Sequence, residues 1–344
     1  MATAGRSIET HGAGPLPALL AAVIGADRAG FALATLAIAP SLAAPTPRIT
    51  RAQLAMALNA ALFVDLLDRV PTAARYVAAR REAGEAIVFD HGALRTIDGA
   101  TGALPRGHGA FARILEPLGY AAGGLYPLPR LTMTGRAFVH RDLPEAIPQF
   151  FVSELHVAEL PAAAREAAAR IFGASHDPLG AEETHALDAL ARDGAASPAD
   201  AATILRGALR AFARQHPVPA LDDYAALLGH SKEGAWIATE GNAFNHATTR
   251  VPDVVALADA LKAQGYPLKD AVEHSANGQV HQTAFLADKV MRPFRLPDGA
   301  LAEREVPGSF YEFITRDVDP ATGTLDLTFD SGNATGIFAV TRSA

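Results

Sequence analysis

The sequence predicts an α+β protein whose sheet is built from two β-α-β-β-β modules, paired into an open, cup-shaped barrel. The prediction depends on a repeat, because strand-like and helix-like segments follow one another in the same order in two separate stretches of the chain. Each stretch also places a histidine on its opening strand and a glutamate on its closing strand, at nearly the same spacing. The pairs are His91 with Glu154 and His246 with Glu312.

Residues 1–84 are expected to form an α-helical N-terminal region. Residues 50–70 carry apolar side chains at helical spacing, with Thr50 as the helix N-cap. Residues 16–44 are also apolar, but the charged Asp27 interrupts them, and the residues before them lack the basic character of a signal peptide. We therefore expect short buried helices here rather than a targeting segment or a membrane span, and a cytoplasmic protein.

The first module is predicted over residues 85–157. Its opening segment, residues 85–97, changes from helical spacing to a β-rich pattern, and residues 111–118 are the one helix expected inside it. Three strand-like segments complete the module, at residues 124–128, 131–140 and 149–156.

The second module is predicted over residues 233–344, after a helical insertion over residues 158–232. Residues 235–246 are expected to form its opening strand, and residues 254–263 an amphipathic helix. Further strands are predicted at residues 272–275, 280–287 and 309–316, with a last hairpin that pairs residues 325–329 with 336–341.

The composition narrows the classes of function. A net charge of −7 provides no positive surface for nucleic acid or for an anionic membrane, so neither partner is expected. The chain has no cysteine, which excludes disulfides, thiolate nucleophiles, zinc fingers and iron–sulfur clusters. Any transition metal must therefore be held by nitrogen and oxygen ligands, and twelve histidines are available to provide them.

His91, His246 and Glu312 are the candidate metal ligands. Because side chains alternate along a strand, a histidine on each opening strand and a glutamate on a closing strand can share the interior of the barrel. Imidazoles and a carboxylate suit divalent iron, manganese or zinc. A carboxylate between Tyr311 and Phe313 is expected to be buried and to need a partner, which a metal ion would provide.

Arg95 is the candidate substrate-binding residue. It follows His91 at a spacing that places both side chains on one face of an extended strand. The planar fork of an arginine binds both oxygens of a carboxylate, so a carboxylate substrate is predicted beside the metal. Taken alone, each residue is better explained as a structural histidine or a rim arginine, and their pairing inside the repeat reverses that preference.

Glu154 leaves the reaction open. By the symmetry of the repeat it is the counterpart of Glu312, and as a fourth ligand it would suit a non-oxidative isomerase or lyase. Without it, two histidines and one carboxylate leave up to three open positions for O₂ and substrate, as in non-haem iron oxygenases. A third alternative is a metal-free protein that binds a small molecule, against which a buried Glu312 argues.

At these residues the chain resembles the 2-oxoadipate dioxygenase/decarboxylases, also called 2-hydroxyglutarate synthases, of the vicinal oxygen chelate superfamily. The likeness extends from about residue 50 to residue 344 and is closest to a shorter branch of the family. The segments that carry it are DH and RT at 90–91 and 95–96, LTMTGR at 131–136, FFVSELH at 150–156, TEGNAFNH at 239–246, QTAF at 282–285 and VPGSFYEF at 306–313.

The resemblance implies a vicinal oxygen chelate fold and a ferrous ion, Fe(II), held by His91, His246 and Glu312. It also implies Arg95 as a residue that binds a substrate carboxylate. The implied reaction is the oxidative decarboxylation of a 2-oxo acid by O₂, with 2-oxoadipate giving 2-hydroxyglutarate and CO₂ in lysine breakdown. The substrate is its own reductant, so no separate co-substrate is expected.

The sequence departs from the longer family members near residue 330. Those members carry a Val-Ser pair that helps to position the substrate, whereas this chain reads DSGNATGIF at residues 330–338. Aligning the Gly-Ile-Phe ends places Gly332 and Asn333 at that pair. We expect Asn333 to donate a hydrogen bond to the substrate in a pocket of different shape.

Overall fold

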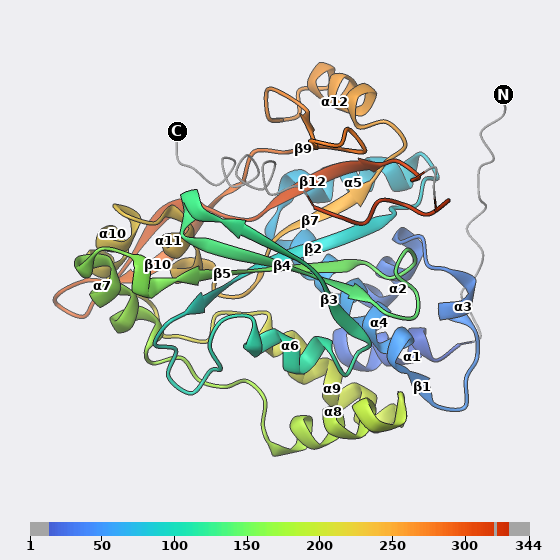
Figure 1. The fold of residues 1–344 in the computed structure, drawn as a ribbon, viewed down its shortest axis with the longest axis horizontal. Helices are drawn as coiled ribbons and strands as arrows, with labels where there is room; N and C mark the ends of the chain where they lie inside the picture. The colour runs from blue at the N-terminus through green and yellow to red at the C-terminus, as the bar shows by residue number, and fades with distance from the viewer. Residues whose placement is uncertain (1–13, 320–321, 330–344) are drawn as a thin grey trace.

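The computed structural model of the protein describes residues 14–319 and 322–329. Within this part of the chain, the main sheet has eight strands in the order β3-β4-β5-β2-β7-β12-β9-β8, and it curls through the middle of the molecule (Figure 1). Its strands are β2 (Phe89–Asp98), β3 (Tyr120–Leu128), β4 (Met133–His140), β5 (Gln149–His156), β7 (Phe244–Arg250), β8 (Glu273–His274), β9 (Val280–Ala284) and β12 (Phe310–Arg316).

The two modules share one order of elements. The first contains β2, α6 (Gly109–Leu115), β3, β4 and β5, and the second contains β7, α12 (Val254–Ala263), β8, β9 and β12. The opening strands β2 and β7 pair antiparallel at the centre of the sheet, and each also pairs in parallel with the closing strand of its own module, β5 or β12. The predicted α+β fold of two β-α-β-β-β modules in one open barrel is therefore confirmed.

The described part of the N-terminal region, residues 14–84, is mainly helical. Its longest helix begins at Thr50, whose side chain accepts a hydrogen bond from the N–H of Gln53, while the Gln53 side chain accepts one from the N–H of Thr50. The predicted N-cap is confirmed. The helices are α1 (Pro15–Ile24), α2 (Ala26–Thr35), α3 (Pro40–Ala43), α4 (Arg51–Arg69) and α5 (Pro71–Glu82).

Part of the helical insertion packs against the N-terminal region. The short strands β1 (Ile49–Thr50) and β6 (Ala195–Ala196) pair with each other, and helix α9 (Pro198–Ala211) contacts both α1 and α4. These helices share one apolar core with one face of the main sheet. The insertion contains α7 (Ala162–Phe172), α8 (Ala181–Asp193), α9 (Pro198–Ala211) and α10 (Leu221–Leu228).

The prediction for the start of the second module was wrong. Residues 235–240, expected to begin the opening strand, belong to helix α11 (Lys232–Glu240). The Ser231 side chain caps this helix by accepting a hydrogen bond from the N–H of Gly234, and Gly241 ends it with a φ of +67°. The segment lacks the one-sided apolar pattern of a surface helix because the helix is buried on nearly all sides: every residue from Glu233 to Glu240 is buried.

One hairpin of the structure was not predicted from the sequence. The chain forms a separate two-stranded sheet from β10 (Lys289–Arg295) and β11 (Leu301–Pro307), which the sequence pattern did not reveal. Of the last predicted hairpin, the structure describes only the first arm, where residues 326–329 have no regular secondary structure and Leu325 makes an isolated bridge to Val318. Its second predicted arm lies outside the described residues.

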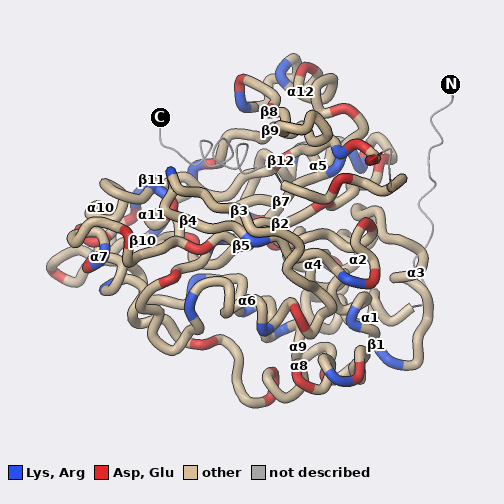
Figure 2. The backbone as a smooth tube through the Cα atoms, in the orientation of Figure 1, with Lys and Arg blue, Asp and Glu red and all other residues tan. Residues whose placement is uncertain are grey.

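Charge is distributed without a dominant patch. Figure 2 shows Lys and Arg interleaved with Asp and Glu along most elements rather than gathered on one of them. In the described part of the chain, the helices are all too short or too polar to cross a lipid bilayer.

Candidate metal centre

One row of side chains crosses the sheet at its centre. The strand register aligns Gln149 of β5, His91 of β2, Thr248 of β7 and Glu312 of β12. His246 lies two positions before Thr248 on β7 and points to the same face. This face, which carries both histidines, is called the inner face below. The pairing of β2 with β7 thus brings the predicted ligands of the two modules together.

His91, His246 and Glu312 form a buried group. One ligand atom from each residue lies within 4.8 Å of the others. Nε2 of His91 is 3.8 Å from Oε1 of Glu312, and the centres of the two imidazole rings are 5.6 Å apart. Among residues 14–319 and 322–329, this is the one group of three such side chains whose ligand atoms converge.

Asp90 and Arg316 orient His91. Nδ1 of His91 donates a hydrogen bond to Oδ1 of Asp90 at 2.8 Å, and Nε of Arg316 donates to both oxygens of Asp90 at 3.0 Å. Burial raises the pKa of Asp90, but the charge of Arg316 and the His91 hydrogen bond outweigh it, so the net pKa is lowered and the carboxylate stays ionised. With Nδ1 occupied as a donor, Nε2 of His91 presents a lone pair toward Glu312, which is the tautomer a metal requires.

The protonation chemistry of the group fits a divalent cation. Burial lowers the pKa of both His91 and His246, which keeps the imidazoles neutral, and it raises the pKa of Glu312 to about 8. Nδ1 of His246 and Oε2 of Glu312 are buried and have no hydrogen-bond partner among the described residues. Buried polar atoms are rarely left in that state. A metal ion would satisfy both atoms and stabilise the carboxylate anion.

A β-bulge flanks each histidine. The register between β2 and β7 shifts once at Asp90 and once at Asn245, so each of these residues is the extra residue of a bulge. The first bulge explains how Asp90 reaches the side chain of its neighbour His91. Between the bulges, Gly92 is required, because a Cβ there would lie 2.1 Å from the Phe244 ring.

Arg95 lies on the inner face with His91, as predicted, but it is not at the rim. Its side chain is completely buried, stacks 4.9 Å from the ring of Trp236, and places Nη2 2.7 Å from Oε2 of Glu233. Burial lowers the pKa of Arg95 to about 10, and the charge of Glu233 opposes that effect. The sequence prediction missed Glu233 because helix α11 was assigned as a strand.

Glu154 lies away from the metal centre, which removes the fourth-ligand alternative. It aligns with Thr96 and therefore points to the opposite face of the sheet from His91. There it bonds to Arg136 and accepts a hydrogen bond from the backbone N–H of His108 at 3.0 Å. Burial raises its pKa, but these partners outweigh burial and lower it overall.

The prediction from the repeat failed for Glu154 because it matched residues by their order in the sequence and not by their partners on the neighbouring strand. Gln149 is opposite His91 in the first module, and Phe310 is opposite His246 in the second. Counting from these partners, the position equivalent to Glu312 is Phe151, not Glu154. The first module therefore carries an aromatic ring at the place where the second carries a carboxylate.

Residues 325–329, called the C-terminal strap below, cover the side of His91. The Phe329 ring packs at 4.8 Å from the His91 ring and at 5.0 Å from Phe151. Nη1 of Arg316 donates hydrogen bonds to the carbonyl oxygens of Asp326 and Thr328, both at 2.8 Å. Asn333, the predicted substrate residue, lies outside the described residues.

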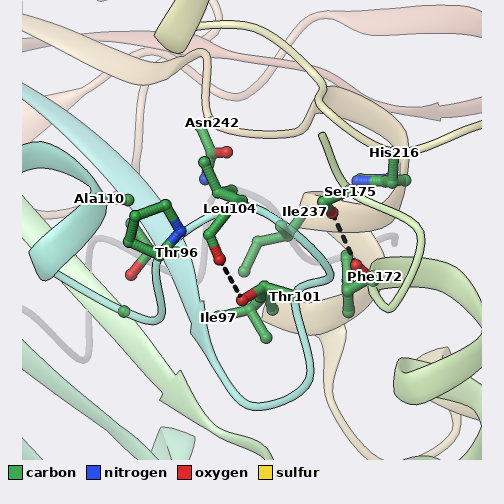
Figure 3. A pocket seen from close by; sticks show the side chains of 12 residues that line it. Thr96, Ile97, Thr101, Leu104, Ala110, Phe172, Ser175, His216, Ile237 and Asn242 are labelled. Atoms are coloured by element: carbon green, nitrogen blue, oxygen red, sulfur yellow. Dashed lines mark hydrogen bonds between the residues drawn. The ribbon is translucent and has the colours of Figure 1, made fainter. Parts of the chain in front are cut away.

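A separate small pocket lies beyond Arg95 on β2. Figure 3 shows it lined by Thr96, Thr101 and Asn242, with His216 and Ser175 at its far side. Its hydroxyl groups are satisfied locally, since Thr101 donates to the carbonyl of Leu104 and Ser175 to that of Phe172. The pocket contains none of the three clustered ligands, so we assign the chemistry to the inner face.

Comparison with known proteins places this fold and site in a class. The chain is similar to a putative glyoxalase superfamily protein from Ralstonia eutropha JMP134, with 50% identity and a TM-score of 0.88 over 92% of this chain and 98% of that one. The molecule is thus a vicinal oxygen chelate protein of the glyoxalase superfamily, with a buried His–His–Glu group that can hold a metal ion.

The family follows from the sequence itself. The family model described as 2-oxoadipate dioxygenase/decarboxylase matches residues 57–323, so the chain belongs to this enzyme family. Two solved hydroxyglutarate synthases in complex with 2-oxoadipate share the fold. The protein from Oryza sativa has 21% identity and a TM-score of 0.66 over 87% of this chain and 96% of that one, and the protein from Pseudomonas putida has 20% and 0.59 over 86% and 74%. A comparison with curated proteins gave no match.

Proposed function

We propose that the protein is an Fe(II)-dependent dioxygenase that oxidatively decarboxylates a 2-oxo dicarboxylic acid. The best candidate reaction converts 2-oxoadipate and O₂ into 2-hydroxyglutarate and CO₂, as in lysine breakdown. The observation that carries the proposal is the buried group of His91, His246 and Glu312 in a chain of this family. The reaction balances without another reductant, because one oxygen atom of O₂ enters the new carboxylate and the other the new hydroxyl group.

His91, His246 and Glu312 would hold the iron. Two imidazoles and one carboxylate leave up to three positions on the metal open, which is the arrangement of non-haem iron oxygenases. Bound there, the iron supplies a site where a 2-oxo acid and O₂ can be activated together. The protein's own contribution is to keep both histidines neutral and the carboxylate within reach.

We assign Arg95 to the far carboxylate of the substrate. Arg95 shares the inner face with His91 and lies farther along β2, so a chain that reaches from the metal along this strand ends at its guanidinium. Glu233 and Trp236 hold that guanidinium in place from α11. This arrangement favours a dicarboxylic 2-oxo acid over a monocarboxylic one.

Aromatic rings limit the entry of water to the centre. Phe329 packs against His91 and is itself in contact with Phe151, and Phe310 packs at 4.8 Å from His246. An apolar wall on both histidines strengthens the electrostatic interactions of the metal site and shields it from side reactions.

The test is to load the protein anaerobically with Fe(II) and to measure O₂ uptake and CO₂ release with 2-oxoadipate. We expect His91→Ala, His246→Ala and Glu312→Ala to abolish both signals. Glu154→Gln and His108→Ala, which alter the opposite face of the sheet, are matched controls and should retain bound iron and turnover. Uptake that persists in the three ligand variants, or is absent with every 2-oxo acid, would overturn the proposal.

A further inference from the structure

Thr248 lies at the centre of the candidate metal site without being one of its ligands. It is the residue of β7 that aligns with His91 on one side and Glu312 on the other, and it is completely buried. Its Oγ1 is 3.0 Å from Nε2 of His91 and 3.2 Å from Oε1 of Glu312. The hydroxyl therefore contacts one potential ligand atom on each of the two neighbouring strands.

The hydroxyl has a single proton to donate. Nδ1 of His91 donates to Asp90, so Nε2 can accept a hydrogen bond from Thr248 as long as no metal is bound to it. Once Nε2 binds a metal ion, its lone pair is used. The Thr248 proton then has one remaining acceptor in the row, Oε1 of Glu312.

We propose that Thr248 is a positioning residue that makes Glu312 a one-oxygen ligand. The hydroxyl holds Oε1 by a hydrogen bond, which leaves Oε2, the oxygen that is buried without a partner among the described residues, to bind the metal. This hydrogen bond holds Oε1 toward Thr248 and occupies one of its lone pairs, so it favours binding of the metal through Oε2 alone over binding through both oxygens. One coordination position thus stays open for the 2-oxo acid. This inference rests on the proposed function, because it requires a metal in the site.

The chain offers a closely matched control. Thr248→Val removes the hydroxyl and keeps the shape of the side chain, and Thr248→Ser restores the hydroxyl. Thr249→Val makes the same chemical change one position along, where the hydroxyl is bonded to the Tyr311 hydroxyl on the outer face of the sheet. A loss that comes only from removing a buried hydroxyl would appear in both valine variants.

The experiment uses Co(II) as a spectroscopic substitute for Fe(II), added to the metal-free full-length protein under anaerobic conditions. We expect Thr248→Val to bind one equivalent of Co(II) with visible absorption bands weaker than those of the wild type, because a two-oxygen carboxylate raises the coordination number. With Fe(II), its KM for the 2-oxo acid should rise about tenfold, the equivalent of one hydrogen bond to a charged group. Thr248→Ser should recover both properties, and Thr249→Val should resemble the wild type.

Each other outcome is decisive. If Thr248→Val and the wild type give the same Co(II) spectrum and the same KM, the hydroxyl does not control Glu312. If Thr248→Val binds no Co(II), the hydroxyl assembles the site rather than setting the binding mode, and the inference is also overturned. If the wild-type protein itself binds no Co(II), the proposed metal-dependent function fails, which separates that failure from the failure of this inference.

Discussion

A buried ion pair orients His91, one of the proposed metal ligands. Arg316 and Asp90 are both buried, and Asp90 in turn orients His91. Such pairs contribute little when they replace apolar packing, but the removal of one partner leaves an uncompensated charge in the interior. The same arginine also donates hydrogen bonds to two carbonyl oxygens of the C-terminal strap, so it connects the Asp90–His91 pair to the strap that covers His91.

Arg316→Met should therefore lower the free energy of unfolding by about 3–5 kcal/mol. Arg250→Met is the matched control, since Arg250 is 3.9 Å from the same carboxylate but partly solvated, and it should cost less than about 1 kcal/mol. Urea unfolding of the metal-free proteins measures both. Equal losses in the two variants would contradict the view that the buried pair dominates.

At the scale of single elements, helix α11 shows how local signals decide a structure. Near the end of this helix, the carbonyl oxygen of Ala238 accepts a hydrogen bond from Nε2 of His216 at 3.0 Å. Gly241 then reverses the chain so that β7 can begin, and a Cβ at that position would lie 2.2 Å from the Cα of Arg214. Both features lie just before β7, the strand that carries His246.

We expect Gly241→Ala to destabilise the protein by more than about 2 kcal/mol, because it adds a backbone clash to the cost of a left-handed conformation. Gly265→Ala is the control: its φ is +77°, but nothing lies within 4 Å of the added Cβ, so only the conformational cost of about 1 kcal/mol remains. Unfolding midpoints and Co(II) affinity test this. The prediction fails if both variants are equally stable and bind the metal equally well.

His216 should make α11 sensitive to acid. Burial lowers its pKa from 6.5 to about 4, so the unfolded chain takes up a proton that the folded protein excludes. This contribution to the free energy of unfolding is fully present above pH 6.5 and is lost as the pH falls toward 4. The loss amounts to about 2 kcal/mol at about pH 5. His216→Gln should reduce the difference in unfolding free energy between about pH 7 and about pH 5 by that amount, measured by urea titration at both values. An unchanged difference would show that His216 is not responsible.

At the scale of the whole molecule, two apolar cores join the helices to the sheet. The N-terminal helices share a core with α8 and α9 of the insertion and with the outer face of the sheet. The other two helices of the insertion, α7 and α10, form a second core with α11 at the end of the inner face. The paired strands β2 and β7 lie between these cores and carry both histidines. Damage to either core is therefore expected to disturb the metal centre.

One unfolding transition should follow from this arrangement. Trp236, the only tryptophan of the chain, lies buried on α11 and reports on the second core, whereas far-ultraviolet circular dichroism reports on all helices. The urea midpoints from the two signals should coincide. Separate midpoints would show that the N-terminal helices and the insertion unfold independently of the sheet.

Sequence by itself determined the repeat, the fold class and the three clustered ligands. A histidine or glutamate in a β-rich segment of alternating side chains has only two faces to choose from, and burial between Tyr311 and Phe313 required a partner for Glu312. The N-cap at Thr50 was equally local, since it depends on a residue and its neighbour three positions on.

Only the tertiary structure decided the rest, because register and bulges are properties of paired strands. The register shift between β2 and β7 at Asp90 lets this residue bond to the side chain of its neighbour His91. The register of β5 places Glu154 on the face of the sheet opposite His91. Thr248 and Glu233 acquired their places from strand and helix pairing between distant parts of the chain. The pairing of distant strands determines which side chains come into contact, and the pattern of residues along one segment does not reveal that pairing.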